Sequence, residues 1–175
     1  MKKAQVFFLS SIVSISAACP AHAADNSKGA RTEVLGYTLG NSTCAEIKRN
    51  LSSSHPELVE GRMSDIPKNY KAITTNSSGF GLMGLTRVSM LCENDDKGTL
   101  HGVSLSFSKE TSETVTEIFD KKYTKLQSQG DSALYKTPGG VLMTSSTSDD
   151  LKAIYTDMTL FQDLSDMANS MDSKL

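Results

Sequence analysis

The sequence predicts an α+β domain: an antiparallel sheet of hairpins or a meander, with two or three helices packed on one face and one disulfide. Three observations lead to this class. Several short segments alternate apolar and polar residues, as half-buried strands do. Residues that favour turns separate these segments and predict hairpins. Other segments repeat apolar residues three or four positions apart, which is typical of amphipathic helices.

The first 23 residues are typical of a cleavable secretory signal. Lys2 and Lys3 precede an uncharged run, rich in apolar residues, over residues 4–18. Small residues at Ala21 and Ala23 fit cleavage after Ala23. The run is shorter than the roughly 20 residues that span a bilayer, so we expect a cleaved product without a stable membrane span.

Cys19 offers an alternative, a lipid-modified lipoprotein. A lipoprotein signal usually carries an aliphatic residue three positions before its cysteine, where this chain has Ser16, and Pro20 follows the cysteine. This alternative is therefore disfavoured, and we expect a periplasmic or secreted protein.

Length and charge restrict the remaining chain. The 175 residues divide into the signal (1–23), a flexible N-terminal arm (24–32) and one domain (33–175). The whole chain holds 18 basic and 20 acidic residues, and cleavage removes Lys2 and Lys3 from the basic set. A mildly acidic domain without basic clusters is a poor candidate for binding nucleic acid or anionic lipid.

Two cysteines follow the signal, Cys44 and Cys92. An even number of cysteines in an exported chain favours a disulfide. A bridge that closes a loop of this length stabilises the fold by about 4 kcal/mol in the chain-entropy description. A redox-active pair is the alternative, but such cysteines usually lie close together in sequence.

The first half of the domain combines a helix with strands. A short strand is expected at 34–37, and Thr43 with Glu46 forms a capping box for a helix that runs to about Ser52. Residues 52–67 are polar, contain two prolines and predict a loop. The predicted strands that follow are 70–75, 85–92 and 100–107, the last two joined as a hairpin. In the third strand we expect His101 to share a face with Val103, Leu105 and Phe107.

The second half repeats this alternation of element types. A helix is expected from Thr111 or Ser112 towards Gly130, with Tyr123 and Leu126 on its apolar stripe. Strands are predicted at 133–136, 141–147 and 151–157, before a C-terminal amphipathic helix with Leu160, Leu164, Met167 and Met171 on one side.

The segment from Gly79 to Gly84 spells a dinucleotide-binding fingerprint, Gly-x-Gly-x-x-Gly. That chemistry needs a helix after the glycines, whereas a strand is predicted here, so a flexible loop is the better interpretation. Phe80, Leu82 and Met83 lie among the glycines and are our candidate contacts with a protein partner.

No set of residues predicts catalysis, a cofactor or a metal. Only His55 and His101 follow the signal, and we interpret His101 as a satisfied core or edge histidine. A metal site at His55, Glu57 and Glu60 lacks any known ligand spacing. Neither cysteine is expected to be a free nucleophile.

The stretch 35–43, Leu-Gly-Tyr-Thr-Leu-Gly-Asn-Ser-Thr, runs into a helix and then a three-strand meander. This order resembles small periplasmic domains of the BamE-like type, over residues 35–107. The resemblance implies an α+β fold and a non-enzymatic envelope-binding role, and we transfer no site residues from it.

Together these observations predict a non-enzymatic exported domain that engages a protein partner or an envelope component. An inhibitor or immunity protein for a secreted toxin or hydrolase is one specific form of this function. The alternatives are a periplasmic protein that binds a small ligand or a metal and, third, an uncharacterised hydrolase. The oligomeric state and the role of the 52–67 loop are not predicted.

Overall fold

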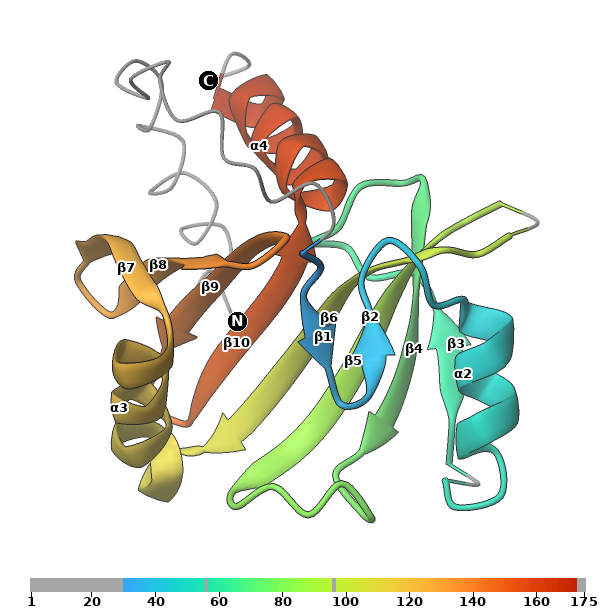
Figure 1. The fold of residues 1–175 in the computed structure, drawn as a ribbon. Helices are drawn as coiled ribbons and strands as arrows, with labels where there is room; N and C mark the ends of the chain where they lie inside the picture. Colours follow the sequence, from blue (N-terminus) through green and yellow to red (C-terminus); the bar gives the residue numbers. More distant parts are fainter. Residues whose placement is uncertain (1–29, 56, 96, 173–175) are drawn as a thin grey trace, which may run out of the picture.

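The computed structural model describes residues 30–172 except 56 and 96 (Figure 1). It confirms the α+β class and the antiparallel sheet. The elements in chain order are β1 (Glu33–Val34), β2 (Tyr37–Thr38), α2 (Cys44–Leu51), β3 (Val59–Gly61), β4 (Tyr70–Asn76), β5 (Leu85–Glu93), β6 (Leu100–Ser108), the short 3₁₀ helix η2 (Lys109–Thr111), α3 (Ser112–Lys122), β7 (Thr124–Gln129), β8 (Ser132–Thr137), β9 (Gly140–Ser146), β10 (Asp150–Asp157) and α4 (Met158–Asp172).

Eight strands form one sheet in the order β3-β4-β5-β6-β10-β9-β8-β7, and every neighbouring pair is antiparallel. Strands β1 and β2 form a separate small hairpin. The order contains two meanders, β3 to β6 and β7 to β10, that meet along β6 and β10. Helix α2 precedes the first meander and α3 the second, so the two halves share one topology of a helix followed by four strands.

The pairing of β6 with β10 gives this repeat an approximate twofold relation. Along the junction Val103 is opposite Tyr155, Leu105 is opposite Ala153 and Phe107 is opposite Leu151. These residues form an apolar row on both strands, and all of them are buried in the same core cluster. Because the strands are antiparallel, a rotation about an axis through their middle places each half on the other.

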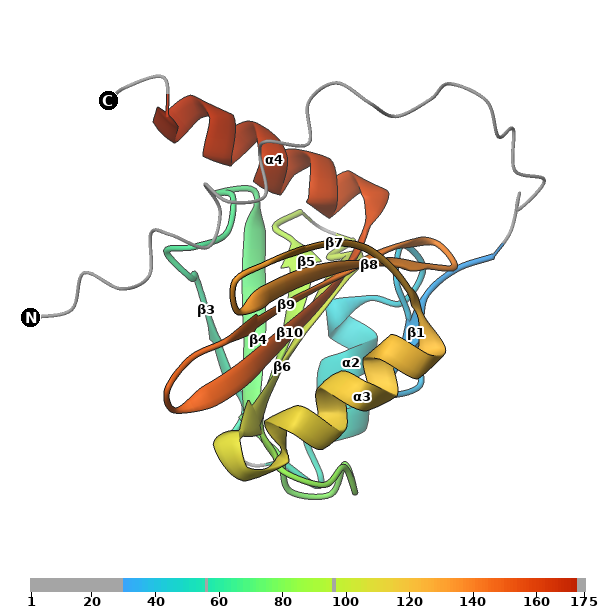
Figure 2. The ribbon, with the colours of Figure 1, turned by 90° about the vertical axis from the view of Figure 1, so that its left-hand side faces the viewer.

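The larger core lies between one face of the sheet and the layer formed by α2, the β1–β2 hairpin and α3. Helix α2 contributes Cys44, Ile47 and Leu51, and α3 contributes Val115 and Phe119. Two helices therefore pack on one face, as predicted, and Figure 2 shows both on the same side of the sheet.

Helix α4 packs on the opposite face, where a second apolar cluster lies. Its buried residues are Leu160, Leu164 and Ala168. Leu160 and Leu164 belong to the same cluster as side chains from strands of the sheet. Adjacent residues of these strands point to opposite faces, so the same strands also contribute to the first core. The strand residues of this second cluster are Tyr70, Ala72, Leu91, Leu134, Val141 and Met143.

The predicted disulfide is confirmed. Cys44 at the start of α2 is bonded to Cys92 near the end of β5, with their Cα atoms 6.1 Å apart. Both residues are fully buried in the first core. One of the two hydrogen bonds of the predicted capping box is formed, since the Thr43 hydroxyl accepts a hydrogen bond from the Glu46 amide. The bridge thus fastens a capped helix to a central strand.

Three segments differ from the sequence prediction. The strand expected at 34–37 is instead a hairpin, in which Leu35 and Gly36 form the turn between β1 and β2. Helix α3 ends at Lys122 rather than near Gly130, and residues 124–129 form strand β7. Leu126, predicted on the helical stripe, is 53% exposed, so no burial holds it in a helix. Gly130 has φ +55°, and it turns the chain from β7 into β8 instead of ending a helix. The predicted 52–67 loop also contains the short edge strand β3.

The predicted signal (1–23) and residues 24–29 of the predicted arm lie outside the described residues. Thr32, the last residue of that arm, is buried and its hydroxyl hydrogen bonds to that of Thr137 at 2.8 Å. No helix in the described part of the chain is long and apolar enough to cross a membrane.

Gly102 on β6 lets α4 lie close to the sheet. A Cβ atom at this position would be 2.6 Å from the Leu160 side chain and 2.9 Å from the backbone oxygen of Tyr155. Both distances are shorter than real Cβ contacts, and Leu160 is itself fully buried. Any side chain at Gly102 must therefore displace the Leu160 side chain of α4 and the neighbouring β10 backbone.

We expect Gly102→Ala to lower the free energy of unfolding by about 1–3 kcal/mol, because overpacking a filled core costs that much. Urea denaturation of the full chain measures it. Gly61→Ala is the matched control, since a Cβ there meets nothing within 4 Å, and its effect should stay within about 0.5 kcal/mol. Equal effects of the two substitutions would show that α4 does not depend on the close approach at Gly102.

Candidate functional site

Residues 77–84, here called the glycine loop, connect β4 to β5. Gly79, Gly81 and Gly84 have φ values of +83°, +65° and +71°, a region that side chains with a Cβ rarely adopt. The loop makes its own hydrogen bonds, including that from the Ser78 amide to the Asn76 side chain at 2.9 Å. At its end the Ser108 amide donates to the Gly84 carbonyl at 2.7 Å. Glycine at these three positions therefore permits the observed backbone conformation, and hydrogen bonds attach the loop at both ends.

Phe80 is the anchor of the glycine loop. Its ring stacks on that of His55, with centroids 4.8 Å apart and planes 21° from parallel, and it packs against the first core. His55 is 2% exposed. Gly79 crosses the same imidazole closely, since a Cβ there would lie 3.7 Å from the ring. The buried histidine thus supports the loop from beneath.

Leu82 and Met83 extend from the same loop into solvent. They are 45% and 63% exposed, which places them among the large apolar side chains that the described surface leaves uncovered. Residues 76–84 contain no charged side chain. Of the three predicted partner contacts, Phe80 is attached to the core and the other two are accessible.

The glycines do not form a nucleotide site of the fingerprint type. The segment that follows Gly84 is strand β5, as predicted, so no helix N-terminus faces the loop from that side. Thr111 of η2 fills the space beside Gly84 instead, where a Cβ would lie 1.9 Å from its hydroxyl oxygen. The third glycine is required by this close packing.

The structure does not bring together all three residues of the metal site considered from the sequence, His55, Glu57 and Glu60. His55 Nδ1 lies 3.6 Å from Glu57 Oε1, and that oxygen accepts a hydrogen bond from Thr75 at 2.8 Å. Glu60 instead pairs with Lys48 of α2 and with Lys71, the latter at 3.2 Å. Among the described residues no group of three His, Cys, Asp or Glu side chains could hold a metal ion.

His101 does not share the face of Val103, which corrects the sequence prediction. Leu91 pairs with Gly102 while Cys92 pairs with Leu100, so His101 is the extra residue of a β-bulge in β6. Leu100 takes the core position, and the imidazole lies against the edge of the Tyr70 ring with centroids 5.7 Å apart. The bulge has redirected the histidine towards the base of α4.

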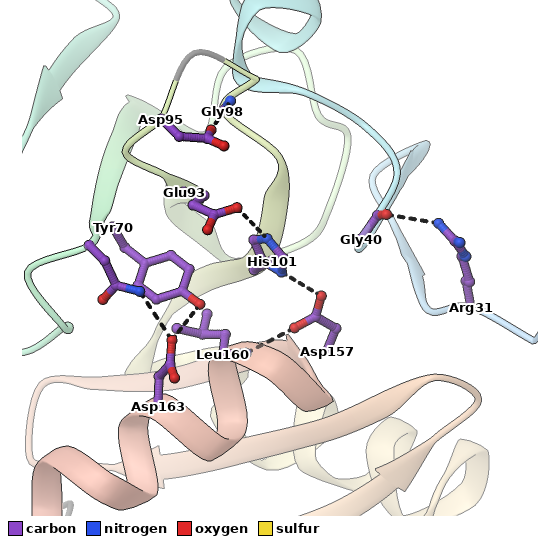
Figure 3. A network of polar contacts seen from close by, with 11 residues as sticks. Arg31, Gly40, Tyr70, Glu93, Asp95, Gly98, His101, Asp157, Leu160 and Asp163 are labelled. Atoms are coloured by element: carbon purple, nitrogen blue, oxygen red, sulfur yellow. Dashed lines mark hydrogen bonds and ion pairs between the residues drawn. The ribbon is translucent and has the colours of Figure 1, made fainter.

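The His101 ring lies between two carboxylates (Figure 3). Its Nδ1 is 2.7 Å from Asp157 Oδ2, and its Nε2 is 3.5 Å from Glu93 Oε2. The hydrogen bond to Asp157 is the main factor that raises the pKa of His101, and burial of the ring opposes it. We call these three residues the His101 cluster.

Asp157 also caps helix α4, because it is the last residue of β10 and directly precedes the helix. Its Oδ1 accepts a hydrogen bond from the Leu160 amide at 3.0 Å, which satisfies a free donor in the first turn of the helix. One turn later Asp163 accepts hydrogen bonds from the Tyr70 hydroxyl at 2.8 Å and from Asn69 at 3.2 Å. Burial and the Asp163 contact raise the pKa of Tyr70.

Sequence reasoning missed Asp157 and Glu93 as partners of His101. Asp157 lies 56 residues away from His101 along the chain, and only the pairing of β6 with β10 brings them together. A usable signal was present, since an aspartate three residues before the buried Leu160 fits an N-cap. Neither ring nitrogen of His101 contacts a described serine, threonine or cysteine side chain. The cluster can therefore exchange a proton, but it contains no activated nucleophile of these types.

No family model matches this chain, and neither a curated protein nor a solved structure matches it at a significant level. The resemblance of residues 35–107 to BamE-like domains therefore stays a prediction.

In the glycine loop Phe80 is packed against the core, whereas Leu82 and Met83 are exposed, and substitutions test this division. We expect Phe80→Ala to lower the free energy of unfolding by about 1–3 kcal/mol, because it removes the stacking on His55 and the packing of the ring against the first core. Leu82→Ala and Met83→Ala, at exposed positions, should change it by less than about 0.5 kcal/mol. Chemical denaturation of the three variants makes the comparison. A loss at Leu82 or Met83 as large as that at Phe80 would contradict the division.

Proposed function

We propose that this chain is an exported, non-enzymatic binding domain that engages a protein partner through Leu82 and Met83 of the glycine loop. The observation that carries the proposal is the exposure of two large apolar side chains, next to each other on one short uncharged loop. Adjacent exposed apolar side chains are typical of interaction sites.

The chemistry of the loop indicates what the partner offers. Residues 76–84 are uncharged, so an apolar pocket suits them better than a charged surface. Met83 adds an adaptable thioether side chain that conforms to irregular surfaces. An inhibitor or immunity protein that places this loop in the cleft of a secreted enzyme is the specific form we favour.

The sheet edges are weaker candidates for a partner. Edge strand β3 has only three residues, which gives a short ladder for strand addition. Edge strand β7 carries Lys125 and an irregular register between Lys125 and Gln127, two features by which proteins prevent edge pairing. The glycine loop has no such protection.

Export to the periplasm or outside the cell is part of this proposal. The proposal rests on the signal predicted in residues 1–23 and agrees with the buried Cys44–Cys92 disulfide, since oxidising compartments favour such bonds. In such a compartment a disulfide-stapled binding domain encounters envelope components and secreted proteins.

Site-specific photo-crosslinking tests the loop as the contact. A benzoylphenylalanine placed at Leu82 in the full chain should crosslink one protein from envelope or secreted fractions of the source cell. The matched control places it at Ile118, which is 50% exposed on α3 and so equally accessible. Crosslinking of the same protein from both positions, or from neither, would contradict the proposal.

Affinity for the captured protein provides the quantitative prediction. We expect the double variant Leu82→Ser/Met83→Ser to bind at least about ten-fold more weakly, because central apolar contacts contribute more than 1 kcal/mol each. Titration calorimetry measures this, and the unfolding midpoint confirms that the variant is folded. Unchanged affinity in a folded variant would move the contact to another surface.

A further inference from the structure

We propose that the His101 cluster is a pH-dependent clasp that holds helix α4 on the sheet, and that loss of a proton from His101 loosens the helix. This inference does not depend on the proposed partner contact. It concerns the opposite end of β4 and β5 from the glycine loop, where Tyr70 and Glu93 lie.

The clasp joins three segments that are distant in sequence. His101 belongs to β6, Glu93 ends β5, and Asp157 stands between β10 and α4. Asp157 contacts the imidazole with one carboxylate oxygen and the Leu160 amide with the other, at 2.7 and 3.0 Å. The same carboxylate therefore fixes both the histidine and the first turn of the helix, as Figure 3 shows.

Only a doubly protonated imidazole can donate towards both carboxylates. His101 is 9% exposed, so water gives little compensation for either ring nitrogen. Its Nε2 has no hydrogen-bond partner within the described structure other than the ion-pair contact with Glu93 at 3.5 Å. A neutral ring could still donate from Nδ1 to Asp157, but it would then present a lone pair to the Glu93 carboxylate.

Other charged groups near the cluster do not replace the histidine proton. From α4, Asp163 is negative and already accepts the Tyr70 hydroxyl of β4. Arg31 of the N-terminal segment is a cation on this side, and its guanidinium is hydrogen bonded to the Gly40 carbonyl at 2.8 Å. Deprotonation of His101 leaves Glu93, Asp157 and Asp163 with less compensating charge, and repulsion then acts on the start of α4.

Several contacts of the helix are concentrated at this end, while Leu164 and Ala168 add apolar contacts further along. The contacts at this end are the cap at Asp157, the close approach of Leu160 to Gly102 and the hydrogen bond between Asp163 and Tyr70. Loosening α4 would uncover apolar strand side chains of the second core, which include Leu91, Leu134, Val141 and Met143.

The direction of the pH effect follows from linkage. The pKa of His101 is raised in the folded chain, so the proton stabilises the fold. This contribution is complete below the unfolded value of about 6.5 and disappears as the pH rises through the raised value. We therefore expect α4 to be held most firmly in mildly acidic solution and to open on the alkaline side.

Hydrogen exchange of the full chain, read by mass spectrometry, tests the clasp. After correction for the intrinsic pH dependence of exchange, peptides of α4 should open about ten-fold more often at about pH 9 than at about pH 6. Peptides from β5 and β6 should change less. Equal protection of α4 at both pH values would overturn the proposal.

Two variants identify the group that titrates. His101→Gln should make α4 protection independent of pH, because a neutral amide replaces the imidazole. His55→Gln is the matched control, a second buried histidine outside the cluster, and should leave the pH dependence intact. The reverse pattern would assign the effect to His55 and overturn the clasp.

A third variant covers the case in which His101→Gln does not fold. Asp157→Asn removes the charge but retains a good N-cap. The imidazole resonance of His101, assigned by substitution and followed by NMR, should then titrate at a lower pH than in the parent chain, and opening of α4 should move with it. An unchanged titration midpoint would show that Asp157 does not hold the proton.

Discussion

The antiparallel pairing of β6 with β10 joins the two halves of this architecture into one sheet. In the described sheet it is the junction between the two meanders, and the remaining neighbours are successive strands within each half. The pairing places α2 and α3 on the same face, because the halves share one topology and are related by a rotation about the junction. It also brings Asp157 to His101. The large core, the position of the helices and the His101 cluster all depend on this one register.

Local chemistry was sufficient to predict most of the elements. Thr43 and Glu46 marked the start of α2, and the alternating residues of 100–107 marked β6, because both signals act over a few neighbouring positions. The predicted boundary between α3 and β7 was wrong because Leu126 fits the spacing of a helical stripe but remains 53% exposed in the folded chain. Burial decides such cases, and burial is a property of the assembled sheet.

The site was predictable only in part, for a similar reason. The glycine loop and the exposure of Leu82 and Met83 could be anticipated from composition, since glycines and a predicted strand lie together in one short segment. The role of His101 could not, because a single bulged residue changes which side of β6 the ring faces. Its partners Glu93 and Asp157 come from two other strands. The support of Phe80 by His55 likewise joins residues that no local pattern connects.

The position of the disulfide has a consequence for the order of assembly. Cys44 and Cys92 both belong to the first half, and 48 positions separate them. Contacts between close neighbours in sequence form at low entropic cost, so a meander can assemble before it meets a distant strand. The bridge can therefore close within β3 to β5 and α2 while the second half is still unfolded. The first half would then present β6 as a stapled template on which β10 completes the sheet.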